Sequence, residues 1–230
     1  MSEPARTGAP AQPLRLTLVR HGETDGQSSI RYFGRTNVPL SAAGREQMRH
    51  VAAALGTRQF AAIYSSTLVR STEAALIISN GHAPGWTLTQ IAGFNEIDFG
   101  DWEGLTAEEI EARHPALYAR WELRRGDFCY PGGESTSQFR ARVLQALHQL
   151  LAEACGDDLL FILHKGVIRS IVAELLGDEE IQRQSLSIEL GSIHVVTREH
   201  GQWKAERLDH TAHLSRISVG ESVRAWSVGE

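Results

Sequence analysis

Arg20, His21 and Gly22 stand together at the end of an apolar segment of the sequence, residues 14–19. That segment first alternates and then runs apolar with β-branched residues, which is typical of a short buried strand. In open α/β sheets, ligands bind at the carboxyl ends of the strands. A guanidinium, a titratable imidazole and a flexible glycine at such an edge therefore predict a binding site.

A second histidine, His164, ends another continuous apolar segment, residues 159–163. Arg70 falls in the first turn of a helix that we predict after a short strand at 61–65, so it can face the same pocket as His21. Two imidazoles and two guanidiniums would suit a phosphoryl dianion, because arginine offers planar paired donors that lysine cannot match. Without its sequence context, Arg70 would more simply be an exposed helix residue.

Predicted strands and helices alternate along the chain. The helices are expected at 41–56, from Thr67 onward, at 106–128 with a break near Pro115, from Ser135 to 154, and at 166–176. The strands are expected at 14–19, 61–65, 88–91 and 159–163, with a closing hairpin of 188–197 and 203–208. This alternation predicts an α/β fold in which a mostly parallel central sheet is covered by helices on both faces, a three-layer sandwich. The hairpin requires one antiparallel strand, which we place at an edge.

Residues 104–134 form an insertion between a predicted strand and a predicted helix. Thr106 and Glu109 have the spacing of a capping box, which indicates a helix start there. Because the insertion would lie over the binding edge of the sheet, we predict that it is a helical lid.

At 230 residues and 42% hydrophobic, the chain is long enough for one well-buried core. We expect a single domain over 14–214, a disordered lead-in at 1–13 and a C-terminal tail at 215–230. The net charge is −5 and the basic residues are scattered, so we expect no nucleic-acid or membrane partner.

Cys129 and Cys155 are the two cysteines of the chain and are too few for a disulfide framework, which favours a reducing compartment. No apolar segment is long enough to span a bilayer, and no signal-peptide core follows the start. These features together predict a cytoplasmic protein.

Six ordered segments of the chain resemble the histidine phosphatase superfamily, also called the phosphoglycerate mutase-like family. The segments are 20–24, 34–41, 64–70, 96–104, 131–135 and 164–169. The resemblance covers about residues 14–214 and is to the phosphatase-type branch, because Ile-Asp-Phe-Gly follows Glu96.

The resemblance implies that His21 is the nucleophile, which takes the phosphoryl group as phosphohistidine. Arg20, Arg70 and His164 would hold the phosphoryl oxygens, and Glu96 would act first as acid and then as base. These positive donors around the phosphoryl group would replace the charge neutralisation that a metal supplies, so no metal and no cofactor are expected. His21 must be neutral to attack whereas His164 serves better charged, so we expect their pKa values to differ.

Six further residues are candidates for substrate binding: Thr24, Gln27, Gly34, Arg124, Arg125 and Lys165. Gln27 stands where family members commonly have asparagine, and its amide can still donate. Arg124 and Arg125 resemble a paired arginine of the mutases, although they could be a solvated helix end. Lys165 could bind a second anionic group of the substrate or could point outward. If these cations face the pocket, the substrate carries a carboxylate or second phosphate.

The favoured function is a metal-independent phosphomonoesterase acting on a small phosphorylated metabolite. One alternative is a cofactor-dependent phosphoglycerate mutase, and another is a catalytically silent member that binds a phosphorylated ligand. Asp209, His210 and His213 could suggest a metal pair but lack a third ligand. The sequence leaves open whether the chain forms a homodimer.

Overall fold

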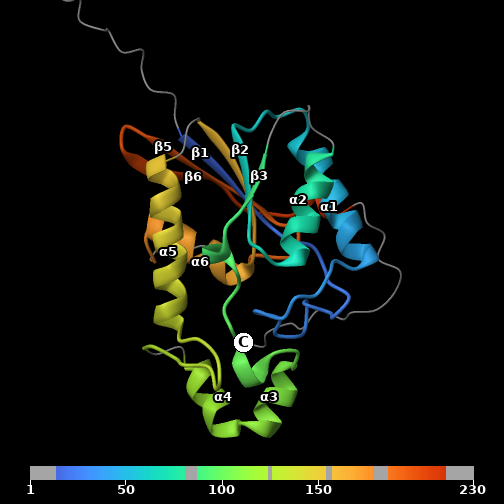
Figure 1. Cartoon of the computed structure of the whole chain (residues 1–230), viewed down its shortest axis with the longest axis vertical. Coiled ribbons are helices and arrows are strands. Elements are labelled where there is room, and N and C mark those ends of the chain that lie inside the picture. Colours follow the sequence, from blue (N-terminus) through green and yellow to red (C-terminus); the bar gives the residue numbers. More distant parts are fainter. Residues whose placement is uncertain (1–13, 81–86, 124–125, 154–156, 179–185, 216–230) are drawn as a thin grey trace, which may run out of the picture.

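The computed structural model describes residues 14–80, 87–123, 126–153, 157–178 and 186–215. They build a six-stranded sheet flanked by helices (Figure 1). The strands are β1 (Leu14–Arg20), β2 (Ala62–Ser65), β3 (Leu88–Gln90), β4 (Asp158–Leu163), β5 (Ile193–Glu199) and β6 (Gln202–His210). Their order across the sheet is β3-β2-β4-β1-β5-β6, and β1, β2, β3 and β4 are parallel. The predicted α/β fold with a mostly parallel sheet is confirmed.

The one strand that runs against the others is β5, which pairs antiparallel with both β1 and β6. Our prediction that the antiparallel strand lies at an edge is therefore wrong: β5 is internal and β6 forms the edge. The hairpin explains this position, because the first strand of the hairpin pairs with β1 and the second can then add only on the outside.

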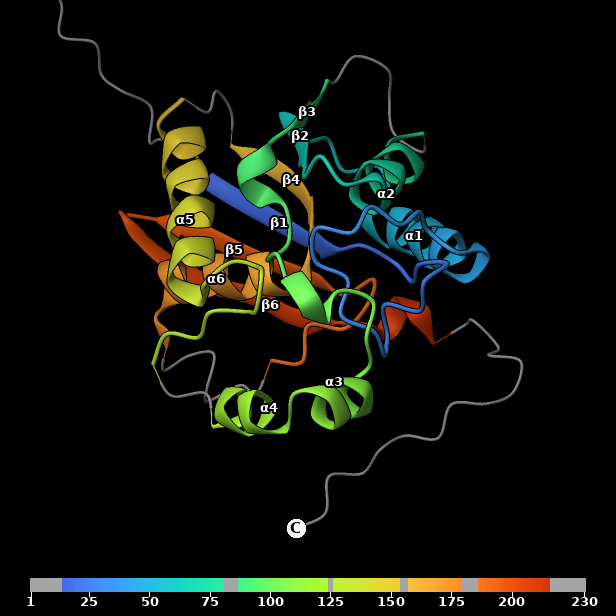
Figure 2. The ribbon, with the colours of Figure 1, turned by 60° about the horizontal axis from the view of Figure 1, so that its bottom comes forward.

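Helices cover both faces of the sheet (Figure 2). On one face, α1 (Ala42–Leu55) and α2 (Val69–Ser79) pack on alternate strand residues such as Val19 and Ile162. On the other face, α5 (Thr136–Glu153) and α6 (Lys165–Leu176) pack on Leu18 and Phe161. The alternation of side chains along each strand thus produces two separate cores.

The insertion at 104–134 holds two short helices, α3 (Ala107–Arg113) and α4 (Pro115–Glu122), which lie below the sheet in Figure 1. Thr106 Oγ1 accepts from Glu109 N (3.3 Å) while Thr106 N donates to the Glu109 carboxylate (2.9 Å), so the capping box is confirmed. Pro115 begins α4, so the break is confirmed. Short 3₁₀ helices occur at Ala92–Phe94, Gly100–Trp102 and Ala212–Leu214. The assignment of the insertion as a lid stays a prediction.

Two element starts differ from the predictions by more than one residue. Helix α2 begins at Val69 and not at Thr67, because Thr67 instead bonds through its N and Oγ1 to Asn95 Oδ1, both at 2.9 Å. Strand β5 begins at Ile193 and not at Ile188, because Ile188 has a left-handed backbone (φ 51°). The expected lead-in, and the expected tail apart from Ser215, lie outside the described residues.

Among the described residues, no helix is long and apolar enough to cross a membrane.

Candidate active site

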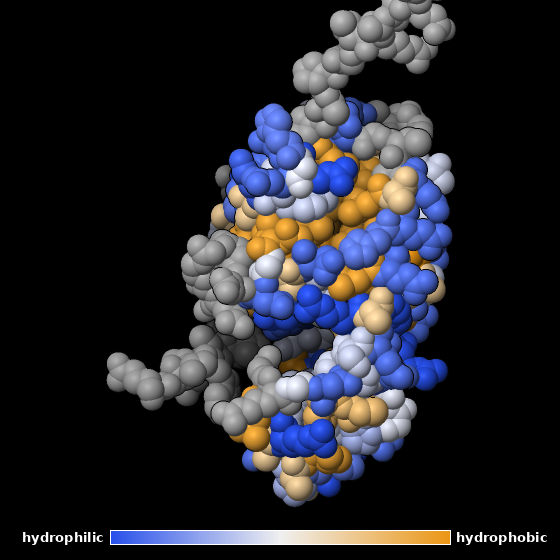
Figure 3. All heavy atoms as spheres, turned by 90° about the vertical axis from the view of Figure 1, so that its left-hand side faces the viewer, coloured by the Kyte–Doolittle hydropathy of each residue, from blue (hydrophilic) through white to orange (hydrophobic). Residues whose placement is uncertain are grey.

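A cavity of about 1050 Å³ opens at the carboxyl ends of β1 and β4. Figure 3 shows the hollow between the body that carries the sheet and the part that holds α3 and α4. Because Arg20 lies opposite Leu163 in the parallel pair, the residues that follow, His21 and His164, emerge side by side. Their ring centres are 5.1 Å apart.

His21 is 4% exposed, and its Nδ1 lies 2.7 Å from the carbonyl oxygen of Gly22. A carbonyl only accepts, so Nδ1 carries the proton and Nε2 keeps a free lone pair in the neutral ring. Burial lowers the pKa of His21 well below its ordinary value, and the charges of Arg70 and Arg20 lower it further. His21 is therefore held neutral with Nε2 available as a nucleophile.

His164 is fully buried between the guanidinium of Arg70 and the hydroxyl of Ser66. Its Nδ1 accepts from Arg70 Nε (3.3 Å), and its Nε2 therefore carries the proton and donates to Ser66 Oγ (2.7 Å). Burial, followed by the charge of Arg70, lowers the pKa of His164 well below its ordinary value. The prediction of a charged His164 is wrong for this structure, because burial and then the charge of Arg70 disfavour the protonated ring.

Arg70 is fully buried, so it is not an exposed helix residue. Its Nη1 donates to Thr36 O (2.8 Å), and its Nη2 donates to Gly34 O (2.7 Å) and Phe33 O (3.2 Å). Burial lowers its pKa to about 10. Arg70 thus fixes the backbone of residues 33–36 beside the two histidines.

Arg20 lines the cavity and donates from Nη1 to Ile188 O (2.7 Å). Its Nε is buried without a hydrogen-bond partner among the described residues. Burial lowers its pKa, against the opposing charges of Glu96 and Glu189. A buried cationic donor without a partner at a cavity wall is suited to an anion.

Glu96 is 8% exposed and lines the cavity. Its Oε1 accepts from Ile97 N (3.1 Å) and its Oε2 from Gly166 N (2.9 Å), in the first turn of α6, where the helix dipole favours an acidic group. A Cβ at Gly166 would lie 2.5 Å from Glu96 Oε1, so only glycine admits this approach. Arg142 on α5 donates to the carbonyl oxygens of residues 93, 95 and 96 and thereby fixes the segment that carries Glu96.

Glu103 organises the same wall, although its residue pattern alone does not distinguish it from the neighbouring acidic side chains. Its carboxylate accepts from the backbone N–H groups of residues 34, 35, 36 and 99 at 2.9–3.1 Å, and also from Thr36 Oγ1. In the sequence, the role of Glu103 in the site is indicated only by its place inside the segment 96–104.

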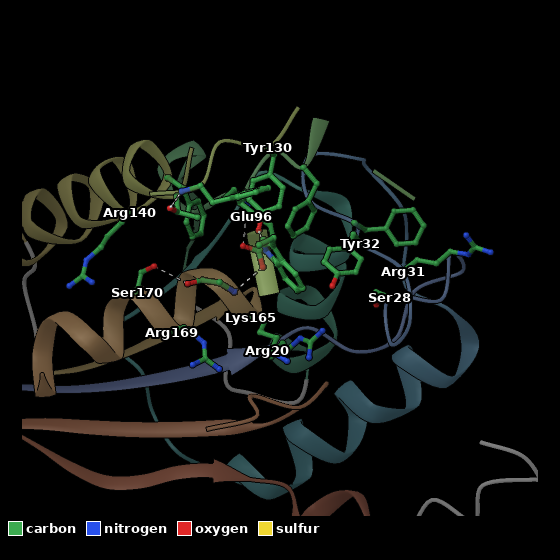
Figure 4. A pocket seen from close by; sticks show the side chains of 18 of the residues that line it. Arg20, Ser28, Arg31, Tyr32, Glu96, Tyr130, Arg140, Lys165, Arg169 and Ser170 are labelled. Atoms are coloured by element: carbon green, nitrogen blue, oxygen red, sulfur yellow. Dashed lines mark hydrogen bonds between the residues drawn. The ribbon is translucent and has the colours of Figure 1, made fainter. Parts of the chain in front are cut away.

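The candidate substrate residues divide into two groups. Lys165 lines the cavity (Figure 4), whereas Thr24, Gln27 and Gly34 do not, as far as the structure describes the chain. Gln27 is exposed with a φ of 62°, and Thr24 is buried with its Oγ1 accepting from Ser28 N (3.3 Å). Gly34 is a packing position, because a Cβ there would meet Ile97 O at 1.7 Å. Arg124 and Arg125 lie outside the described residues.

Residues 28–33, which the sequence did not indicate, line the cavity instead. The rest of the cavity wall includes aromatic and basic side chains. The aromatic lining residues are Tyr32, Phe33, Phe99, Trp121, Phe128, Tyr130 and Phe139. The basic lining residues besides Arg20 and His21 are Arg31, Arg120, Arg140, Lys165 and Arg169. The cavity therefore combines a cationic inner end with a wall that can pack against an apolar or ring-shaped group.

Asp209, His210 and His213 do not form a metal site. The rings of His210 and His213 stack 5.4 Å apart, and His213 Nε2 donates to Gly191 O (3.0 Å). In the described part of the chain, no three His, Cys, Asp or Glu residues come together in a way that could hold a metal ion.

Residues 16–211 match the family model of the histidine phosphatase superfamily, branch 1. A glucosyl-3-phosphoglycerate phosphatase of Mycolicibacterium vanbaalenii is 33% identical over 71% of this chain and 74% of its own length. A metal-independent phosphoserine phosphatase of Arabidopsis thaliana is 29% identical over 90% of this chain and 86% of its own length. The chain spans about half (53%) of a longer relative, a bifunctional protein of Mycobacterium tuberculosis that is 32% identical over 84% of the chain.

The fold is shared with solved structures. A mycobacterial glucosyl-3-phosphoglycerate phosphatase superposes with a TM-score of 0.74 at 27% identity, over 87% of this chain and all of that one. The match of the family model over most of the chain, together with this fold and the paired histidines at its sheet edge, shows that the chain belongs to the histidine phosphatase superfamily.

Proposed function

We propose that this chain hydrolyses phosphate monoesters without a metal, through a phosphohistidine on His21. The observation that supports this most directly is the Nδ1–Gly22 hydrogen bond, which leaves Nε2 unprotonated in a neutral, buried imidazole that lines the cavity. A neutral imidazole beside two guanidiniums can attack an anionic phosphoryl group, because the guanidiniums offset the repulsion between nucleophile and phosphate.

The phosphoryl oxygens would be bound by Arg20, which lines the cavity, and by Arg70 and His164, which lie beside His21 but are not themselves cavity-lining residues. Arg20 offers its unpartnered Nε and Arg70 its remaining Nη1 N–H. Burial and then the arginine charges lower the pKa of His164, and a bound dianion would offset the arginine charges. His164 would then take up a proton on Nδ1 in place of the hydrogen bond from Arg70 Nε and become a further donor. The charged His164 expected for the reaction would then exist only while a phosphate dianion is bound.

In the first step, His21 Nε2 forms a bond to phosphorus while the bond from phosphorus to the ester oxygen breaks. Glu96, as a carboxylic acid, gives its proton to the departing oxygen, so the alcohol leaves neutral. The products are phosphohistidine, the alcohol and the Glu96 carboxylate.

In the second step, the Glu96 carboxylate takes a proton from water, and the water oxygen attacks phosphorus. The bond between Nε2 and phosphorus breaks, which restores neutral His21, protonated Glu96 and free phosphate. One carboxyl group serves both steps, in accord with its fixed position on Gly166 N and Ile97 N.

The substrate is proposed to be a small phosphorylated metabolite with a sizeable body. The cavity is much larger than a phosphoryl group, and its outer part combines aromatic side chains with Lys165 and several arginines. The relatives named for glucosyl-3-phosphoglycerate and phosphoserine suggest a panel of carboxylate-bearing phosphate esters.

The test is hydrolysis of p-nitrophenyl phosphate in EDTA by the wild-type chain and by His21→Asn, followed by that panel. Turnover that survives EDTA and disappears with the substitution supports the proposal. A metal requirement, or full activity without His21, would contradict it. Phosphate binding without any turnover would instead support the silent, ligand-binding alternative.

A further inference from the structure

The segment 187–192, which leads into β5, encloses the end of β1 at Arg20. Arg20 N donates to Ser192 O (3.1 Å), and Gly191 N donates to Arg20 O and His21 O, both at 3.2 Å. The side chain of Arg20 bonds to the same segment through Nη1 and Ile188 O (2.7 Å). Both the backbone and the guanidinium of Arg20 are thus positioned by this segment.

Ile188 holds an unusual backbone conformation at the point where it meets Arg20. Its φ is 51°, in the left-handed region, and its side chain is fully buried. A β-branched residue rarely adopts this conformation, because its side chain crowds its own backbone. Such strain persists only where the surroundings impose it, and it is concentrated at functional sites.

Asp209, at the end of β6, supplies that constraint. Its Oδ2 accepts from Ser187 N (3.1 Å), Ser187 Oγ and Ile188 N (3.2 Å), and its Oδ1 accepts from Glu189 N (3.2 Å). Asp209 itself has a φ of 48° and lies where the register between β5 and β6 shifts, so the bulge turns its side chain toward the segment. Asp209 N donates to Nδ1 of the buried His194 (3.1 Å), which anchors it to β5.

The carboxylate is held in its ionised form. Burial alone would raise the pKa of Asp209, but the hydrogen bonds from Ser187, Glu189 and Ile188 lower it below its ordinary value. Three successive backbone N–H groups gathered on one carboxylate fix the backbone of residues 187–189 as a unit.

We propose that Asp209 is a positioning residue for phosphate recognition, acting through Ile188 on Arg20. By holding Ile188 in its left-handed conformation, Asp209 fixes the carbonyl that receives Arg20 Nη1. Because the guanidinium is planar, fixing Nη1 also fixes the direction of the unpartnered Nε and of the remaining N–H groups. Asp209 need not touch the substrate. This inference rests on the proposed function, in which Arg20 binds the phosphoryl group.

The first test compares Asp209→Asn with the wild type in competitive inhibition by inorganic phosphate. We expect the inhibition constant to rise about tenfold, since an amide keeps the shape but cannot accept all four donors, and the loss of one fixed charged hydrogen bond has about this size. KM for p-nitrophenyl phosphate should rise with it, by more than kcat falls. A matched control is Asp158→Asn, which removes the negative charge that Arg58 Nε contacts (2.6 Å) at the opposite end of β4 and should leave phosphate inhibition unchanged.

The second test places Asp209→Asn in the Arg20→Ala background. Here the substitution should change phosphate inhibition by less than twofold, because there is no guanidinium left to position. An equal tenfold effect in both backgrounds would overturn the proposal, as would an unchanged inhibition constant for Asp209→Asn alone. If Arg20→Ala itself does not weaken phosphate binding, the proposed role of Arg20 fails instead.

Folding of each variant is checked by circular dichroism. If Asp209→Asn does not fold, Ser187→Ala removes only the hydroxyl donor and should raise the phosphate inhibition constant about threefold. A folded Ser187→Ala with unchanged inhibition would then overturn the proposal.

Discussion

Gly166→Ala should displace the acid–base carboxyl group while leaving the phosphate site intact. A Cβ at position 166 would lie 2.5 Å from Glu96 Oε1 and 3.1 Å from the ring of Phe139. Ordinary contacts begin near 3.4 Å, so the carboxylate must move by about 0.9 Å. In the described chain, no hydrogen bond joins Gly166 to Arg20, Arg70 or His164.

The size of the effect follows from this displacement. A misplacement of about 1 Å costs on the order of 10²-fold in rate, or about 2.7 kcal/mol in the activation free energy. Stability should change little, since alanine gains about 1 kcal/mol of helix propensity over glycine and the displaced side chains offset it. We therefore expect kcat to fall about 100-fold with phosphate inhibition nearly unchanged.

The assay is single-turnover formation of the phosphoenzyme from an alkyl phosphate and from p-nitrophenyl phosphate. The alkyl ester should show the full loss, because its leaving oxygen needs the proton from Glu96, and the aryl ester should lose less than tenfold. Gly177→Ala is the control: Gly177 ends the same helix with a φ of 92° and open space around it, so this change should lower stability only. Equal losses for both esters, or an unchanged rate for the alkyl ester, would refute the role of Glu96.

Four further outcomes are expected. Arg142→Lys should lower kcat and cost about 2 kcal/mol in urea unfolding, because lysine cannot hold Glu134 and three carbonyl groups together. Thr106→Ala should cost about 1 kcal/mol, measured the same way, through loss of the cap. Burial lowers the pKa of His194 to about 4, whereas the unfolded ring titrates near 6.5, so the unfolded state binds more protons as the pH falls. The contribution of His194 to stability should therefore fall by about 2 kcal/mol from pH 7 to 5, and stability should depend less steeply on pH in His194→Gln. The lowered pKa of His21 predicts that the acid limb of kcat/KM lies below pH 6.5, and a limb above pH 7 would contradict it.

The sequence predicted the inner end of the site well, because strand ends are local features. Apolar segments ending in Arg20-His21 and in His164, in an alternating α/β pattern, place both histidines at one edge of a parallel sheet. Arg70 followed from its position in the first turn after a strand, and the structure brings it to within hydrogen-bond distance of His164.

The outer part of the site depends on contacts between distant residues and could not be predicted in this way. Glu103 and Arg142 act on backbone groups many residues away, and no local pattern shows that their partners will be N–H or carbonyl groups. Gln27 was expected in the cavity, but the turn that follows Thr24 gives it a positive φ and exposes it. The strain at Ile188 likewise arises from Asp209, across the hairpin.

The charge state of His164 could not be predicted because it depends on which atom of Arg70 it meets. Arg70 Nε donates to Nδ1, so the ring must be neutral in this structure. A sequence shows that an arginine and a histidine share an edge, but it does not show the direction of the hydrogen bond between them.

The most direct test of the central claim is rapid-quench trapping of the enzyme during turnover of a phosphate monoester in EDTA, followed by mass-spectrometric mapping of the phosphorylated residue. We expect an acid-labile phosphoryl group on His21 that forms at least as fast as kcat and is absent in His21→Asn. Phosphate on another residue, or steady turnover with no phosphoenzyme and a requirement for metal, would contradict it.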